Sequence, residues 1–237
     1  MAQFVSREMG TPHAPSMSMS NGSTGETARL EMFSDGVLAI AITLLSLGLA
    51  VPSHEHEPLL ARLIQAWPRH LAFFTSFVTI GIVWINHHRL FTHIHRVSHG
   101  LLLWNGLLLM SVTVIPFTSG LVAASIGSAD GPTAAAAYSA NLLLTTLAFN
   151  VLWRHATRRH RLLDRHITPA TIQRINLQYG FGPLLYLASF GVALGSALAS
   201  MILNCALAAF FALPAFALPD TVPGSPRIPD DAYPASG

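Results

Sequence analysis

The chain has 237 residues and a formal net charge of +2, with 51% hydrophobic and only 10% charged residues, against about 25% charged residues in soluble domains. This composition excludes an ordinary water-facing surface and predicts a membrane protein, and so few charges predict no nucleic-acid partner. The chain has no Lys and one cysteine, Cys205, which excludes a Walker A phosphate loop, a lysine Schiff base, an internal disulfide and a multi-cysteine metal site.

Both ends of the chain are polar. Residues 1–27 are rich in Ser, Gly and Met and lack the continuous apolar run of a secretory signal peptide, so they are predicted to form a disordered cytoplasmic tail. Residues 219–237 are rich in Pro and Asp and are predicted to form a second such tail. The residues between them, 28–218, are predicted to form one six-helix transmembrane domain in an all-α fold.

The expected spans follow from apolar runs of about 20 residues, the length that crosses a bilayer as a helix. Four runs meet this criterion directly: 30–51, 71–90, 101–123 (with Pro116 inside it) and 134–153. The last run, 179–218, is twice the required length, so we expect a tight turn near residues 195–200 to divide it into two short helices. The alternative is five spans and a re-entrant segment.

The placement of arginine predicts the orientation of the chain. Arg29 precedes the first span, Arg89 and Arg96 separate the second from the third, and most remaining arginines lie between the fourth and fifth. The alternate connections are poorer in net positive charge, which predicts that both termini lie in the cytoplasm. We therefore expect a multi-pass protein of the plasma (inner) membrane, in contact with its lipids.

Asp35 lies inside the first span, about one turn from its cytoplasmic boundary. An ionised carboxylate in a span requires a polar partner, and helix-depth arithmetic brings several candidates to the same level. The expected cluster contains seven residues: Arg29, Ser34, Asp35, His87, His88, Trp104 and Asn105. The cluster either fixes the first three spans to one another or handles protons or ions directly.

A helical wheel divides the first span into two faces of different chemistry. One face, which starts at Asp35, carries small and slightly polar residues that suit close helix packing. The other carries Ile40, Thr43 and Leu47 and is apolar, with one hydroxyl in its middle. Composition alone leaves open whether this second face contacts lipid or protein.

The run from Arg29 through Phe33-Ser34-Asp35 to Leu45 resembles the first helix of the transmembrane protein 175 family of lysosomal and bacterial potassium channels. Residues 84–91, Trp-Ile-Asn-His-His-Arg-Leu-Phe, resemble the end of that family's second helix. The resemblance implies a homotetramer of six-helix subunits, in which the first helices surround a central pore. It also implies that apolar side chains of that helix, rather than a ring of backbone carbonyls, select the ion.

Carried over residue by residue, the resemblance assigns Ile40 to the pore constriction and Thr43 to a nearby hydroxyl layer, with Leu44 and Leu47 as further apolar layers. It assigns a structural polar network to the cytoplasmic end of the first helix, with these members: Arg29, Phe33, Ser34, Asp35, His87, His88, Trp104 and Asn105. The implied function is a potassium-permeable, leak-like cation channel that transports K⁺, needs no cofactor and is not an enzyme.

A proton- or metal-coupled membrane transporter is the strongest alternative, and it would use Asp35 with His87 and His88. Histidines are frequent near that connection, where His93, His95 and His99 follow, and a second cluster of His and Glu occupies residues 54–57. No cysteine supports either cluster as a metal site, and both lie at the predicted membrane surfaces. An intramembrane enzyme is disfavoured because Asp35 has no second membrane carboxylate to form a catalytic pair.

Overall fold

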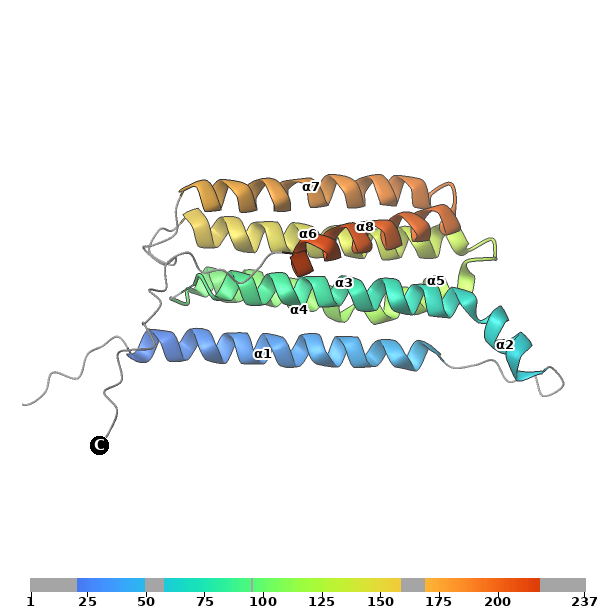
Figure 1. Cartoon of the computed structure of the whole chain (residues 1–237), viewed down its shortest axis with the longest axis horizontal. Coiled ribbons are helices and arrows are strands. Elements are labelled where there is room, and N and C mark those ends of the chain that lie inside the picture. The colour runs from blue at the N-terminus through green and yellow to red at the C-terminus, as the bar shows by residue number, and fades with distance from the viewer. Residues whose placement is uncertain (1–20, 50–57, 95, 159–168, 218–237) are drawn as a thin grey trace, which may run out of the picture.

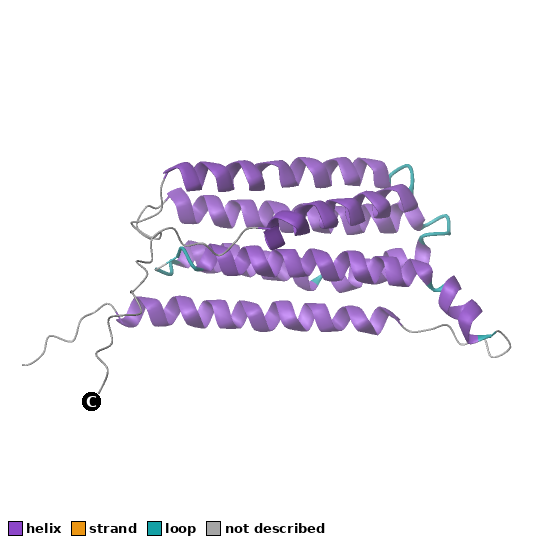
Figure 2. Cartoon of the chain, viewed as in Figure 1, coloured by secondary structure: helices purple, strands orange, loops and turns teal. Residues whose placement is uncertain are grey.

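The computed structural model describes residues 21–49, 58–94, 96–158 and 169–217, and the regular elements in these ranges are helices (Figures 1 and 2). Most of them run along one common axis. The elements, in chain order, are α1 (Asn21–Leu45), the 3-10 helix η1 (Ser46–Leu49), α2 (Leu59–Gln65), α3 (Trp67–Phe91), α4 (His99–Thr113), α5 (Ile115–Ser125), α6 (Gly131–Arg158), α7 (Pro169–Ala193) and α8 (Ala197–Ala217).

Within the described ranges, four helical segments are long and apolar enough to cross a membrane: Gly25–Leu49, Trp67–Phe91, His99–Ser125 and Gly131–Arg158. They coincide with the first four predicted spans, which confirms the all-helical fold class. Two shorter apolar stretches, Gly180–Ala193 and Ala197–Ala212, follow them. Helix α1 starts at Asn21, so residues 21–27 of the predicted tail are helical; the rest of that tail and residues 219–237 lie outside the described residues.

Pro116 divides the third span into α4 and α5. Helix α4 ends at Thr113 and α5 begins at Ile115, so that Pro116 occupies the first turn of the new helix. Proline has no N–H to donate to the preceding turn, and it is tolerated in a first turn because the N–H groups there have no helical partner. The helix break in this span therefore lies at Val114, immediately before the turn that contains Pro116.

The long apolar stretch near the C-terminus is divided by a turn at Leu194, Gly195 and Ser196, as predicted. The backbone N–H groups of Gly195 and Ser196 donate to the Val192 carbonyl and close the end of α7. The Ser196 Oγ then accepts from the Ala199 N–H at 3.2 Å and caps α8. Serine caps the new helix while a short turn reverses the chain.

The helix ends divide into two groups at opposite ends of the bundle (Figure 1). At the left end in this view, α1 and α4 begin and α3 and α6 end. The connection from α5 to α6, the turn from α7 to α8 and the projecting helix α2 lie at the right end. Arg29, Arg89 and Arg154 therefore lie toward the left end, which matches the arginine distribution used to predict orientation.

A buried cluster of neutral polar side chains joins α6, α7 and α8. The amide of Asn204 donates to Ser139 Oγ at 3.1 Å and accepts from Ser189 Oγ at 2.8 Å, while Ser200 Oγ lies 3.0 Å from Ser139 Oγ. Ser139, Ser189, Ser200 and Asn204 are each 0% exposed. In lipid, hydrogen bonds of this kind hold helices together because apolar contact alone gives little preference for protein over acyl chains.

Asn204→Leu keeps the approximate side-chain volume and removes the interhelical hydrogen bonds at the centre of this cluster. We expect it to lower the free energy of unfolding by about 1–2 kcal/mol, measured by reversible denaturation in mixed micelles. Thr113→Val is the control, because the Thr113 hydroxyl is exposed and bonds only to the Met110 carbonyl of its own helix. Equal stability of the two variants would contradict a role for Asn204 in helix association.

Candidate functional site

Helix α1 lies at the edge of the bundle and attaches to it through one narrow face (Figure 1). Ser34, Leu38, Ala41 and Leu45 recur at helical spacing and are between 0% and 4% exposed. They pack against α3, α4 and α5. The other faces of the membrane-spanning part of α1 are exposed or half-buried.

Another face of α1 carries a series of large apolar side chains that its own protomer leaves uncovered. Phe33, Ile40, Leu44 and Leu47 are 64%, 60%, 43% and 73% exposed; we call these four residues the apolar stripe. Thr43 is exposed within it, and its hydroxyl donates to the Ile40 carbonyl at 2.8 Å. The sequence assigned four residues to the pore: Ile40, Thr43, Leu44 and Leu47. All four lie on one accessible face of α1.

The buried face of α1 is joined to α4 and α3 by a directional chain of hydrogen bonds. Asn105 donates its amide N–H to Ser34 Oγ at 2.9 Å, and Ser34 Oγ donates to the Leu30 carbonyl at 2.9 Å. The Asn105 Oδ1 lies 2.9 Å from His87 Nε2. Because an amide oxygen only accepts, His87 carries its proton on Nε2 and donates it.

All three side chains that form these hydrogen bonds are buried: Ser34 and His87 are 0% exposed and Asn105 is 1% exposed. The His87 ring stacks on Phe91 with a centroid distance of 4.4 Å, and its Nδ1 has no hydrogen-bond partner in the described residues. Each member therefore has a fixed orientation. Replacing any one of them would leave a buried polar group without a partner, which costs about 1–3 kcal/mol.

Two further pairs join α1 to α3 nearer the protein surface, and neither is predicted from the sequence. Trp84 donates its indole N–H to Asp35 Oδ1 at 3.0 Å. His88 Nδ1 lies 2.8 Å from Glu31 Oε1. The sequence spacing could have indicated both pairs, because Trp84 lies one turn before His88 and Glu31 lies one turn before Asp35.

The remaining predicted members of the network are not hydrogen-bonded to it. Trp104 is half-buried and packs against the apolar core, while Arg29 and Phe33 are exposed. Within the described part of the chain, neither Arg29 nor Trp104 bonds to Asp35. The carboxylate of Asp35 has the Trp84 indole as its partner instead.

The histidines considered as a metal site do not gather in the structure. Among the residues it describes, no group of three or more His, Cys, Asp or Glu side chains could hold a metal ion. His95 and residues 54–57 lie outside the described residues. His87 and His88 are directed to Asn105 and Glu31 respectively.

The fold and this network define a multi-pass α-helical membrane protein whose first long helix is held to the next two by a buried polar chain. A protein-family model described as endosomal/lysosomal potassium channel TMEM175 matches residues 29–116, which include the whole network. A potassium channel of Chamaesiphon minutus is 44% identical over 191 residues, covering 79% of this chain and 94% of that protein. The chain belongs to the TMEM175 family, as the resemblance in its first and second helices predicted.

Other relatives agree with this assignment. A potassium channel of Streptomyces collinus is 36% identical over 188 residues, covering 78% of this chain and 91% of that protein. The crystal structure of a lysosomal potassium-selective channel TMEM175 homologue from Chamaesiphon minutus superposes with a TM-score of 0.73 at 43% identity, covering 81% of this chain and 100% of that chain. The human endosomal/lysosomal proton channel TMEM175 is 39% identical over 97 residues, only 19% of its length.

Asn105→Leu removes the central member of the buried chain and leaves the His87 N–H without an acceptor. We expect it to lower the free energy of unfolding by about 1–3 kcal/mol, measured by reversible denaturation in mixed micelles. Trp84→Phe, which breaks the more exposed bond to Asp35, is the comparison and should cost less. A smaller loss for Asn105→Leu than for Trp84→Phe would contradict the assignment of α1 attachment to the buried chain.

Proposed function

We propose that this protein is a potassium-permeable, leak-like cation channel of the inner membrane. Four copies assemble around an axis so that their α1 helices surround the pore and the apolar stripes form its constriction. Residues 28–218 cross the membrane six times, with α7 and α8 as the last two spans, and both termini are cytoplasmic. The observation that carries the proposal is that α1 exposes Ile40 at 60% while a different face of the helix is fixed to the bundle.

The choice of potassium rests on the relatives. The two bacterial proteins that match over more than nine tenths of their own length are named potassium channels. The animal relatives named proton channels match over 97 residues, which is 37% of this chain and about a fifth of their own length. The potassium channels match over almost their whole length, so K⁺ rather than H⁺ is proposed as the principal transported ion.

Ion selection follows from the chemistry of the stripe. A ring of isoleucine side chains on the pore axis excludes bulk water, so an ion passes only after it loses part of its hydration shell. K⁺ holds its water less tightly than Na⁺ and crosses at lower cost. Leu44 and Leu47 extend the apolar zone, and the Thr43 hydroxyl, whose proton is held by the Ile40 carbonyl, offers an oxygen to the passing cation.

The orientation of the subunit is supported by its charges. Arg29, Arg89, Arg96 and Arg154 belong to the same end of the bundle, and Asp35 with its partners lies near that end. Cytoplasmic connections of membrane proteins carry an excess of arginine and lysine.

A coupled transporter that uses Asp35, His87 and His88 is less well supported. His87 donates to Asn105, His88 contacts Glu31 and Asp35 accepts from Trp84, so each group has a structural partner. A carrier residue must exchange its partner for the substrate in each cycle. The network instead suits a fixed support that holds α1 upright beside the pore.

Ile40→Asn places an amide in the constriction, which should hydrate the ring and admit Na⁺. We expect the ratio of K⁺ to Na⁺ permeability to fall toward one, measured from reversal potentials of purified protein in planar bilayers. Ile202→Asn is a matched control, because Ile202 on α8 is 57% exposed and receives the same substitution. An unchanged permeability ratio in Ile40→Asn would remove this residue from the selectivity filter.

A cysteine at position 40 tests whether copies of α1 meet at an axis. In a Cys205→Ser background, Ile40→Cys brings several thiolates together, and soft metal ions such as Cd²⁺ bind clustered thiolates tightly. We expect micromolar Cd²⁺ to block K⁺ flux reversibly in Ile40→Cys and to leave Ile202→Cys unaffected. Flux that is insensitive to Cd²⁺ in both variants, with the thiols shown to be free, would contradict a pore lined by α1.

A further inference from the structure

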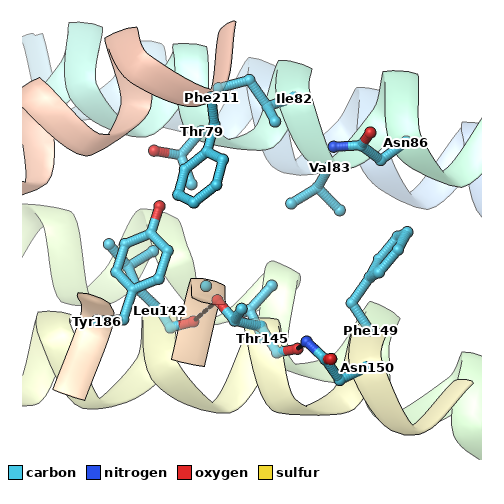
Figure 3. A pocket seen from close by; sticks show the side chains of 12 residues that line it. Thr79, Ile82, Val83, Asn86, Leu142, Thr145, Phe149, Asn150, Tyr186 and Phe211 are labelled. Atoms are coloured by element: carbon cyan, nitrogen blue, oxygen red, sulfur yellow. Dashed lines mark hydrogen bonds between the residues drawn. The ribbon is translucent and has the colours of Figure 1, made fainter. Parts of the chain in front are cut away.

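A cavity of about 80 Å³ lies inside the subunit, apart from the stripe of α1 (Figure 3). It is formed between α3, α6, α7 and α8. Its lining residues are Thr79, Ile82, Val83, Asn86, Leu142, Thr145, Thr146, Phe149, Asn150, Gly182, Tyr186 and Phe211. The lining contains aliphatic and aromatic groups, hydroxyls and amides, but no charged residue, so it does not suit a metal ion or an anion.

The hydroxyl of Tyr186 has no hydrogen-bond partner among the described residues, although Tyr186 is only 7% exposed. Figure 3 shows this hydroxyl directed across the cavity toward Thr79 and Phe211 on the opposite wall. Buried polar groups in proteins are nearly always hydrogen-bonded. The Tyr186 hydroxyl belongs to an almost fully buried residue but opens into the cavity, so it is free to donate to a molecule bound there.

The threonines of the cavity supply acceptors rather than donors. Thr79 and Thr145 donate their hydroxyl protons to the Thr75 and Asn141 carbonyls of their own helices, at 2.7 and 2.9 Å. Thr146 donates to the Leu142 carbonyl at 2.8 Å. Each hydroxyl oxygen keeps a lone pair, so the cavity offers one unused O–H donor and several weak acceptors, which match a ligand hydroxyl.

The cavity is closed on one side and reaches the surface on the other. Leu142, Thr145 and Phe149 on α6 are buried, whereas Ile82 on α3 and Phe211 on α8 are half-buried. The mouth therefore lies between α3 and α8. A molecule dissolved in the surrounding hydrocarbon can reach it from the side.

We propose that this cavity binds a neutral amphiphile with a terminal hydroxyl, of the class of medium-chain primary alcohols. A volume of 80 Å³ holds about three water-sized groups and is well below the roughly 150 Å³ of a cavity that takes benzene. The hydroxyl and the first carbons lie inside, where the oxygen accepts from Tyr186. The rest of the chain passes between Ile82 and Phe211 into the lipid.

The test uses an octanol that carries a diazirine, photoreacted with full-length protein in lipid nanodiscs, with adducts mapped by mass spectrometry. We expect adducts on the α3 and α6 lining peptides that saturate and are displaced by unlabelled octanol. Tyr186→Phe removes one hydrogen bond and should weaken that displaceable labelling about threefold to tenfold. Only adducts on residues other than 186 are counted. The comparison is therefore unaffected by the loss of the tyrosine ring as a target of the diazirine.

Two variants make the result specific. Val83→Phe fills the mouth from a half-buried position and should abolish the displaceable labelling. Tyr138→Phe is the matched control, because Tyr138 is fully buried but its hydroxyl bonds to Ser76 Oγ at 2.9 Å outside the cavity. Labelling confined to lipid-facing residues such as Phe181, or labelling that is equal in wild type, Tyr186→Phe and Val83→Phe, would overturn the proposal.

Discussion

In a bilayer, helix α1 gains little by exchanging lipid contacts for apolar contacts with its own bundle, because acyl chains are as apolar as leucine. Its attachment depends instead on close packing and on the buried hydrogen bonds that join Ser34 to Asn105 and Asn105 to His87. These bonds also fix the rotation of the helix about its axis. The direction in which the apolar stripe points therefore follows from polar contacts on a different face of α1.

Buried hydrogen bonds between side chains also join the other helices of the bundle. Ser119 donates to the Ala72 carbonyl and Ser76 donates to Ser119, so the Tyr138 hydroxyl must supply the proton in its contact with Ser76. This cluster ties α3, α5 and α6 together, as the cluster around Asn204 ties α6, α7 and α8. Neutral hydroxyls and amides perform this task at low desolvation cost, whereas charged groups remain near the ends of the helices.

Hydropathy was sufficient to predict four long spans and the turn after Ala193, because span length is set by membrane thickness. Depth arithmetic also brought Ser34, His87 and Asn105 to one level. Depth does not determine direction around a helix, so the predicted cluster contained Trp104, whereas Trp84 is the tryptophan that reaches Asp35. The start of α1 at Asn21 was missed because hydropathy carries no signal for a polar helical turn outside the hydrocarbon.

The break at Val114 separates two halves of the third span that have different attachments. Helix α4 carries Asn105, which bonds to Ser34 of α1 and His87 of α3, and α5 carries Ser119, which bonds to the Ala72 carbonyl of α3. Because both halves bond to α3, on either side of the break, α3 holds α4 and α5 in line although Pro116 removes one backbone bond between them. The third span therefore keeps its course across the bundle through side-chain bonds to its neighbour, where its own backbone ladder is interrupted.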